Sequence, residues 1–169
     1  RNLLNKEEQV RPYTTEELVR LYRFRVADTV MPLEDFARHE KRKTFQGVFR
    51  DREFFIRYLP SWHEVDEAYG NSRYRPAGYV KVKAKVKDAS ESFYTPCRYL
   101  LEQVETLKGV KAQDIAEAVS LRGRFCEQAE TGESVVIQGK LENVITSDGE
   151  HHRVLLGGSP SDFMISLSL

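Results

Sequence analysis

The chain has 169 residues, of which 40% are hydrophobic, and its 26 lysines and arginines equal its 26 acidic residues in number. This length and composition predict a globular protein with a sizeable core. No stretch approaches the roughly 18 uninterrupted apolar residues of a membrane span, so we expect no membrane partner. A bulk polyanion binder usually has a basic excess. A net charge of zero therefore restricts any nucleic-acid role to a local patch.

The cysteines and the chain ends indicate the setting of the protein. Cys97 and Cys126 lack a metal-binding spacing and no secretory leader is recognisable, so we expect buried thiols in a reducing, cytoplasmic environment. Many lysine, arginine and glutamate residues are typical of a thermophile. Because the chain begins with arginine and stops in mid-alternation at Leu169, we expect a fragment of a longer polypeptide.

Residues 1–43 are predicted to form a helical N-terminal segment. Apolar periodicity predicts a helix over residues 15–30, with Thr14 as its N-cap. A second helix is predicted over residues 33–43 and ends in the basic cluster of residues 38–43. Cations at a helix C-terminus suit the helix dipole, so we interpret this cluster as a solvated helix end. Contact with phosphate is the alternative.

Residues 44–169 are predicted to form an antiparallel, β-rich, barrel-like domain. A hairpin over residues 45–59 opens it, and a short capped helix over residues 61–70 follows. Residues 113–119 fit either a helical turn or a strand. Further strands are predicted over residues 79–87, 93–99, 120–128, 133–145 and 151–156. The fold class is therefore α+β, with N-terminal helices before a small barrel-like β domain.

Three details constrain the predicted strands. Pro96 confines the strand over residues 93–99 to an edge or a bulge, and we expect it to pair antiparallel with residues 79–87. Ser147, Asp148 and Gly149 form a strong signal for a tight hairpin between the last two strands. Gly139 falls at an inward position, which predicts a bend or a close approach of another backbone.

The strongest hint of a partner is the alternating sequence from Tyr79 to Lys87. Its period of two predicts a strand with an apolar inner face and an outer face of lysines. Side chains on one face of a strand lie roughly 6.8 Å apart, so four lysines form a row about 20 Å long. The row comprises Lys81, Lys83, Lys85 and Lys87. Protection of an open sheet edge is the alternative interpretation.

Two arginines and a tyrosine extend the candidate interface. Arg122 and Arg124 are predicted on one face of a strand, where their guanidinium groups suit phosphate or carboxylate. The alternative is that they pair with acidic residues of the sheet, namely Glu127, Glu133 or Glu142. Tyr79 lies in phase with the lysines and is a candidate for stacking on a base, as is Tyr74, although packing in the core or at its rim is the alternative for each.

The sequence contains no catalytic constellation. The four histidines are scattered, neither cysteine has a partner histidine in a recognisable arrangement, and no glycine-rich phosphate loop is present. His151 and His152 are adjacent in a predicted strand, so they point to opposite faces and cannot hold one metal ion together. We therefore expect no catalytic residue, metal site or cofactor in this chain.

Four stretches together resemble a known family. They are Phe54-Phe-Ile-Arg57, Tyr69-Gly70 followed by Tyr74-Arg-Pro-Ala-Gly78, Asp88-Ala-Ser-Glu-Ser-Phe93-Tyr-Thr-Pro-Cys97, and Arg122-Gly-Arg-Phe-Cys-Glu-Gln-Ala129. Over residues 15–169 the chain resembles the C-terminal region of archaeal predicted nucleotidyltransferases, a group within the DNA polymerase β-like superfamily.

The resemblance implies an accessory role. In that superfamily a Gly-Ser pair is followed by an Asp-x-Asp that holds two metal ions. Here Gly158-Ser159 is followed only by Asp162, so no catalytic residue is carried over. A divalent metal is expected only in a separate upstream catalytic module. The chain then resembles an accessory domain that holds the acceptor, RNA or DNA.

Two functions remain open at this stage. The first is an accessory domain that binds nucleic acid through the lysine row, with a log–log salt slope of roughly −2.8 for four single-strand phosphate contacts. Exchange of Lys83 and Lys85 for glutamate should then weaken binding to all sequences alike. The second is a structural or protein-interaction domain without a nucleic-acid ligand, in which the lysines only promote solubility.

Overall fold

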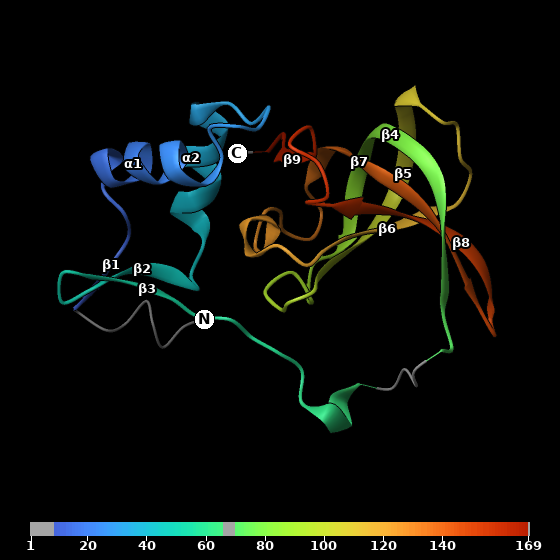
Figure 1. The fold of residues 1–169 in the computed structure, drawn as a ribbon, viewed down its shortest axis with the longest axis horizontal. Coiled ribbons are helices and arrows are strands. Elements are labelled where there is room, and N and C mark those ends of the chain that lie inside the picture. The colour runs from blue at the N-terminus through green and yellow to red at the C-terminus, as the bar shows by residue number, and fades with distance from the viewer. Residues whose placement is uncertain (1–8, 66–69, 169) are drawn as a thin grey trace.

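The computed structural model describes residues 9–65 and 70–168. The helices and a small sheet occupy one half of the molecule and a larger sheet the other half (Figure 1). Along the chain the elements are β1 (Val10–Arg11), α1 (Thr15–Arg25), α2 (Leu33–Arg42), β2 (Gln46–Phe49), β3 (Arg52–Phe55), η2 (Trp62–Glu64), β4 (Arg73–Asp88), β5 (Cys97–Gly109), β6 (Ile115–Ser120), η3 (Gly123–Phe125), β7 (Ser134–Thr146), β8 (Gly149–Leu156) and β9 (Phe163–Ser166).

Both predicted N-terminal helices are present. The backbone N–H of Thr14 donates to Glu17 at 2.8 Å and the Thr14 hydroxyl accepts from the Glu17 N–H, so a capping box begins α1 where the sequence predicts. The helix ends at Arg25, five residues earlier than expected. Proline cannot continue a helix but suits its first turn, and Pro32 precedes α2, which begins at Leu33.

The first hairpin is confirmed, and it lies in a three-stranded sheet of order β1-β2-β3 rather than in the larger sheet. The hairpin thus packs with the helices and does not open the larger sheet, so the expected boundary after residue 43 stays a prediction. Seven buried residues form a small core between this sheet and the two helices: Tyr13, Leu18, Leu21, Val26, Met31, Phe36 and Val48. Phe163 and Ile165 of β9 also pack against this core, which joins the two halves of the molecule.

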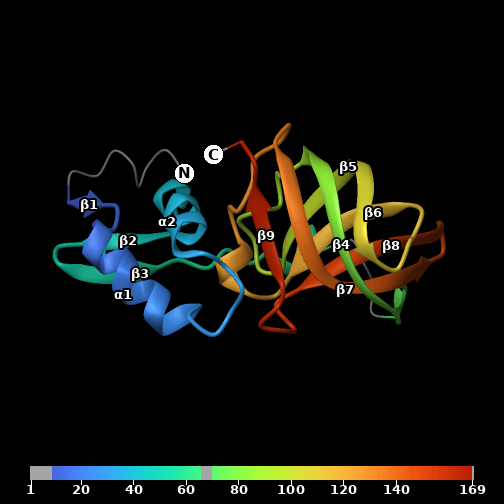
Figure 2. The same ribbon diagram turned by 90° about the horizontal axis from the view of Figure 1, so that it is seen from above.

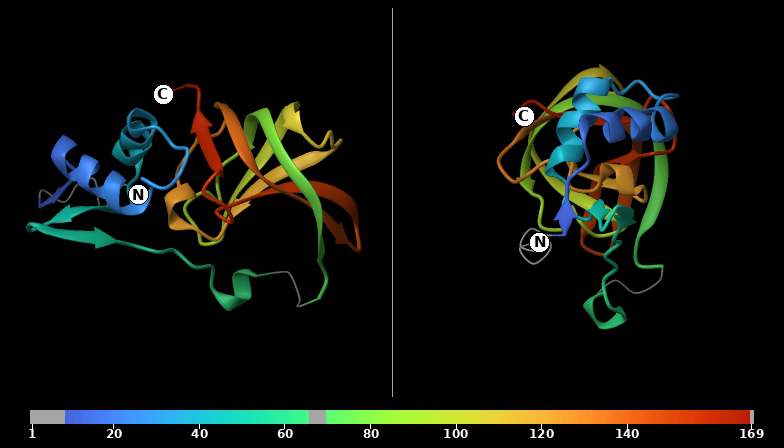
Figure 3. Two further views of the ribbon diagram at one scale, coloured as in Figure 1. Left: turned by 45° about the horizontal axis from the view of Figure 1, so that its top comes forward. Right: turned by 90° about the vertical axis from the view of Figure 1, so that its left-hand side faces the viewer.

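The larger sheet has the order β4-β5-β6-β8-β7-β9, and β4 also pairs with β7. The pairings of β4, β5, β6, β8 and β7 therefore return to β4 and form a ring. All are antiparallel except that of β6 with β8. The strands wrap around a common interior, as Figures 2 and 3 show. The α+β class with a mostly antiparallel sheet is thus confirmed.

The interior of the ring holds the main core. The inward residues of β4, from Val80 to Val86, are no more than 3% exposed, which confirms the phase predicted from the alternation. Tyr99 and Phe125 are the largest fully buried side chains, and the Tyr99 hydroxyl donates to the Phe125 carbonyl at 2.6 Å. Burial of these residues stabilises the ring by roughly 25 cal/mol per Å² of apolar surface.

Four sequence-based expectations are corrected or resolved. Residues 121–127 do not form a strand, because the N–H groups of Phe125 and Cys126 bond back to Arg122 and Gly123 and make η3. The fifth strand starts at Cys97, after Pro96, rather than at residue 93. Residues 115–120 form a strand. The predicted helix over residues 61–70 begins as η2, and residues 66–69, with Tyr69, lie outside the described residues.

Gly139 confirms the predicted close approach. A Cβ atom at this position would lie 2.7 Å from the carbonyl oxygen of Leu155 and 2.9 Å from a methyl of Val154. We expect Gly139→Ala to lower the free energy of unfolding by roughly 1–3 kcal/mol, the usual cost of overpacking, in urea denaturation. Gly158→Ala is the matched control, because the nearest atom lies 3.9 Å away. Equal stability of the two variants would contradict the interpretation that Leu155 and Val154 leave no room for a Cβ atom at position 139.

Candidate nucleic-acid interface

The β4 lysine row lies on the outer surface of the ring, as predicted. Lys83 and Lys87 are exposed, and Lys81 and Lys85 are partly buried. From Val80 to Lys85 the strand is paired with β5 on one side and β7 on the other. Over this stretch β4 is therefore not an edge strand. The protection of an open edge therefore does not account for Lys81, Lys83 and Lys85, whereas Lys87 lies beyond the stretch that is paired on both sides.

The neighbouring strand β5 makes the two ends of the row different. Lys81 lies opposite Lys108, Lys83 opposite Glu105 and Lys85 opposite Glu102. The Lys85 ammonium is 3.5 Å from the Glu102 carboxylate, and both side chains are about two-fifths exposed. Such a surface pair contributes little to stability, but it neutralises local charge. The positive potential is consequently strongest towards Lys81.

The other neighbour, β7, adds no acidic side chain beside the row. The residues opposite Lys81, Lys83 and Lys85 on this side are Gln138, Val136 and Ser134. Within the described part of the chain, no ion pair is formed by Lys81, Lys83 or Lys87. The Lys81 ammonium lies 5.4 Å from the centre of the Phe163 ring, in a cation–π contact. Three ammonium groups thus remain available to a phosphate chain.

Tyr79 is held at the positive end of the row. Its hydroxyl lies 2.8 Å from the Ser161 hydroxyl and donates to a carboxylate oxygen of Asp162. Burial, followed by the hydrogen bond to Asp162, raises the pKa of Tyr79. The residue is 36% exposed and lies opposite Lys140 of β7. The ring is therefore fixed at its hydroxyl end, as a stacking platform requires.

The glycine-rich turn beside Tyr79 is built around Asp162. One carboxylate oxygen of Asp162 accepts hydrogen bonds from the N–H groups of Gly157, Gly158 and Ser159 at 2.9–3.0 Å. Asp162 is 3% exposed. The Gly158-Ser159 pair therefore closes a turn on an internal carboxylate.

Arg122 and Arg124 are not placed on one strand face, because η3 interrupts the extended backbone there. The stem of Arg122 lies against Gly157, and the Arg124 guanidinium lies 5.0 Å from the centre of the Phe125 ring. Burial and the neighbouring Arg122 lower the pKa of Arg124. Within the described residues, neither arginine has an interaction with the lysine row or an ion pair with Glu127, Glu133 or Glu142. These acids bind other residues, including Thr44, Arg42 and Arg153.

Sequence reasoning missed Lys108 and the aromatic support from Phe163. Gln103 has a φ of 52°, and the β4–β5 register shifts nearby. This irregularity breaks the alternation that would have marked Lys108 as outward facing. Phe163 lies 82 residues after Lys81, so no local pattern connects them.

An uncharacterized protein of Methanocaldococcus jannaschii, MJ1086, is similar to this chain. The two are 29% identical over 154 residues, which cover 91% of this chain and 44% of the relative. The chain thus spans less than half the length of this relative, which comes from an archaeon. No protein-family model and no solved structure matches the chain.

The described residues form neither a cluster of metal ligands nor a membrane-spanning helix. Among residues 9–65 and 70–168, no three histidine, cysteine, aspartate or glutamate side chains come together as a metal site. No helix in the same residues is long and apolar enough to cross a membrane. The candidate interface consists of Lys81, Lys83, Lys87 and Tyr79, with Lys108 beside them, while Lys85 is paired with Glu102. Arg122 lies against the glycine-rich turn that Asp162 closes beside Tyr79, and not on β4.

Proposed function

We propose that this chain is a non-catalytic domain that binds single-stranded nucleic acid through the outer face of β4. The observation that carries the proposal is the set of three lysines without ion pairs among the described residues, held in one row beside a fixed tyrosine. A groove that follows the phosphate chain and offers aromatic rings to the bases is the usual device for binding single strands without sequence preference.

The strand ring supports the proposal by fold-level analogy. We interpret it as a small five-stranded barrel in which the first strand, β4, pairs with the second and the fourth, and the third pairs parallel to the fifth. That strand order is the order of the OB-fold, in which the face of the second and third strands and the loops after the first and fourth strands bind oligonucleotides or oligosaccharides. The analogy therefore supports a binding role for the barrel and does not by itself select β4. Fold alone does not determine function, so the lysine row has to provide the chemistry.

The rest of the parent protein completes the proposal. The sequence resemblance implies an upstream nucleotidyltransferase module, and the relative is more than twice the length of the matched region. In this arrangement the upstream module would hold the divalent metals and perform nucleotidyl transfer. The present chain would hold the acceptor strand, RNA or DNA, close to that module.

The proposal predicts binding that weakens steeply with salt. Lys81, Lys83, Lys87 and the exposed Lys108 opposite Lys81 give four phosphate contacts. For four contacts the slope of roughly −2.8 corresponds to a loss of about 50-fold in affinity between 50 and 200 mM salt. With Lys81→Ala/Lys83→Ala, two contacts remain and the loss falls to about sevenfold. The measurement is a fluorescence-anisotropy titration of labelled single-stranded RNA and DNA with both proteins at each salt concentration.

A matched control removes the same charge elsewhere. Arg23 and Lys41 are exposed cations on α1 and α2, so Arg23→Ala/Lys41→Ala has the same net charge as the test variant. The control should keep the slope of the unmodified chain. An identical slope in all three proteins would overturn the proposal, because Lys81 and Lys83 would then make no phosphate contact. An equal fall in both variants would also overturn it, because binding would then follow net charge rather than the lysine row.

A second function is favoured by one observation, an exposed apolar segment between β3 and β4. Trp62 is 83% exposed, Leu59 66% and Val65 50%. A protein-docking domain would use such side chains. Concentration-dependent association in size-exclusion chromatography, abolished by Trp62→Ala and insensitive to salt, would support this function instead.

A further inference from the structure

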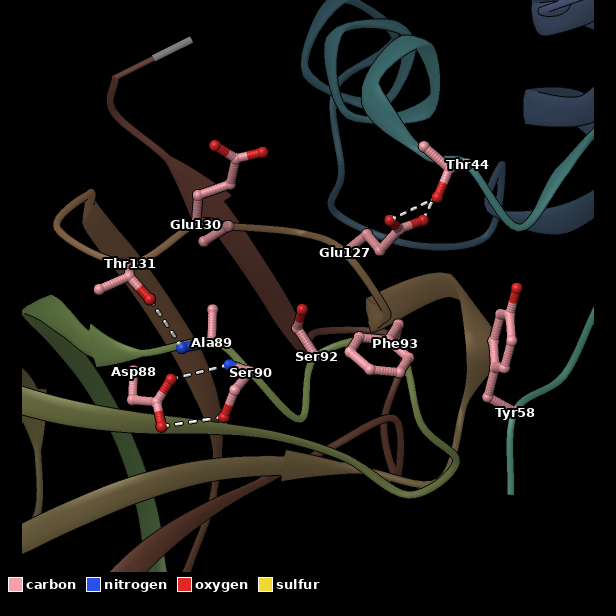
Figure 4. A pocket seen from close by; sticks show the side chains of 11 residues that line it. Thr44, Tyr58, Asp88, Ala89, Ser90, Ser92, Phe93, Glu127, Glu130 and Thr131 are labelled. Carbon is pink, nitrogen blue, oxygen red and sulfur yellow. Dashed lines mark hydrogen bonds between the residues drawn. The ribbon is translucent and has the colours of Figure 1, made fainter. Parts of the chain in front are cut away.

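A cavity of about 480 Å³ opens where β4 ends (Figure 4). This volume lies within the range of roughly 300–1,000 Å³ that is typical of small-molecule sites. Its walls come from the β4–β5 turn, from the segment before β7, and from Thr44 and Tyr58 of the N-terminal region. The lining residues are Thr44, Tyr58, Asp88, Ala89, Ser90, Ser92, Phe93, Glu127, Ala129, Glu130 and Thr131.

One wall of the cavity is aromatic. The rings of Tyr58 and Phe93 stand at 90° with their centres 5.6 Å apart, and Phe93 is 37% exposed. Figure 4 shows both rings on the same side of the opening. A partly exposed ring that is fixed by a neighbouring ring can support a planar ligand by stacking.

The cavity is also lined by three carboxylates, which lie at separate places around it (Figure 4), and two of them are held by hydrogen bonds. The N–H and the hydroxyl of Ser90 donate to Asp88 at 2.8 and 2.9 Å, and these bonds lower the pKa of Asp88. The N–H and hydroxyl of Thr44 donate to Glu127 at 2.7 and 2.8 Å. Glu130 is the third carboxylate. Among the described residues no lysine or arginine lines the cavity, and the Arg42 guanidinium, outside the lining, lies 3.5 Å from Glu130. The lining therefore disfavours phosphate and favours a ligand that donates hydrogen bonds.

Ser92 provides an independent sign of a ligand. The residue is 7% exposed, and within the described part of the chain its hydroxyl has no hydrogen-bond partner. In Figure 4 this side chain lies between the Ala89 side of the cavity and Phe93. This hydroxyl lines the cavity, where a polar group of a bound ligand would take the place of water as its hydrogen-bond partner.

The cavity also continues the lysine row. Lys87 is the last lysine of the row, and Asp88 is the first residue of the cavity wall on β4. Neighbouring side chains of a strand point to opposite faces, so a bound strand whose phosphates follow Lys81, Lys83 and Lys87 would turn around the end of β4 to bring its next nucleotide to the cavity. The row offers the ammonium groups of Lys81, Lys83 and Lys87, and the cavity offers rings, hydroxyls and carboxylates, so the two surfaces suit the two parts of a nucleotide.

We propose that this cavity binds one unpaired nucleobase that carries an exocyclic amino group, stacked on Phe93 with its amino group towards the carboxylates. This inference rests on the proposed function, since the lysine row delivers the strand. Cytosine and adenine present amino donors that carboxylates and hydroxyls accept, and guanine does so as well. Uracil and thymine lack an amino group and present carbonyl oxygens that the carboxylates repel.

The first test compares homopolymers on the unmodified chain. We expect oligo(rC) to bind about tenfold more tightly than oligo(rU) of equal length, which is within the discrimination of a single good base contact. Glu130→Gln should reduce this ratio towards one without changing the salt slope, because Glu130 is an exposed residue outside the lysine row. Phe93→Ala should weaken both homopolymers by removing the stacking surface. Glu91→Gln, an exposed change outside the cavity lining, is the control.

The second test does not depend on the lysine row. Cytidine and uridine, which carry no phosphate, are titrated into the isotopically labelled chain and followed by NMR. We expect cytidine to shift the amide signals of Ser92 and Phe93 in the unmodified chain and in Lys81→Ala/Lys83→Ala alike, and uridine to leave them unchanged.

The outcomes separate the two proposals. Salt-dependent strand binding with no preference for cytosine and no cytidine shifts overturns the cavity proposal and leaves the proposed function intact. Cytidine shifts without strand binding support the cavity and overturn the lysine row as its delivery surface. Equal shifts with cytidine and uridine overturn the requirement for an amino group.

Discussion

Lys43→Met lowers the free energy of unfolding by roughly 3–5 kcal/mol, because it leaves a buried carboxylate without its counter-ion. The Lys43 ammonium lies 2.6 Å from Glu40, and the two side chains are 1% and 3% exposed. The same ammonium donates to the Arg124 carbonyl at 2.7 Å, which ties the end of α2 to η3. Urea denaturation of the variant and the unmodified chain measures the loss.

A second substitution separates charge from packing. Glu40→Gln in the Lys43→Met background removes the unpaired charge and keeps an acceptor for the Gln46 amide, which bonds to Glu40 in the unmodified chain. We expect this double variant to recover more than half of the lost stability. Lys41→Met, at an exposed position on the same helix, should change stability by less than about 0.5 kcal/mol. A single variant as stable as the unmodified chain would refute the argument.

The stability of the chain should fall as the pH drops below 6.5, and His39 should account for part of the fall. His39 is 1% exposed. Its Nε2 accepts from the Ser166 N–H at 3.1 Å, and its Nδ1 donates to the Asp35 carbonyl at 2.6 Å. Burial, followed by the positive charges of Lys43, Arg42 and Arg38 and opposed by Glu40, lowers the pKa of His39 to about 3.

The direction of this pH effect on stability follows from proton binding in the folded and unfolded states. Between pH 6.5 and 3 the unfolded chain protonates this histidine and the folded chain does not, so acid favours the unfolded state. The contribution of His39 to the free energy of unfolding is fully present above pH 6.5. It is lost by up to about 1.4 kcal/mol per pH unit as the pH falls towards 3.

The measurement is the urea unfolding free energy at intervals between pH 4 and 7. His39→Gln should show a shallower dependence than the unmodified chain, whereas His63→Gln, at an exposed position, should not. Identical slopes in all three proteins would show that His39 does not titrate as its surroundings imply. Because the Ser166 N–H belongs to β9, protonation should first loosen the contact between α2 and the larger sheet.

Local sequence was sufficient where the determinants lie within a few residues of each other. The capping box of Thr14 and Glu17 begins α1, the turn at residues 147–149 joins β7 to β8, and alternation sets the two faces of β4. These features depend on hydrogen bonds over three or four residues and on a fixed side-chain period. The prediction from local sequence was wrong at η3. The extended preference of residues 120–128 predicts a strand, but burial of Phe125 in the ring outweighs that preference.

In the candidate interface, too, some features follow from local sequence and others from the tertiary structure. The sequence by itself determined that Lys81, Lys83, Lys85 and Lys87 share one outward face and that Tyr79 is in phase with them. Only the tertiary structure decided that Lys81 faces Lys108 while Lys85 faces Glu102, and that Thr44, Tyr58 and Glu127 meet around one cavity. Side-chain direction follows from the backbone of a single strand, whereas the charge around each side chain depends on the register between strands distant in the chain.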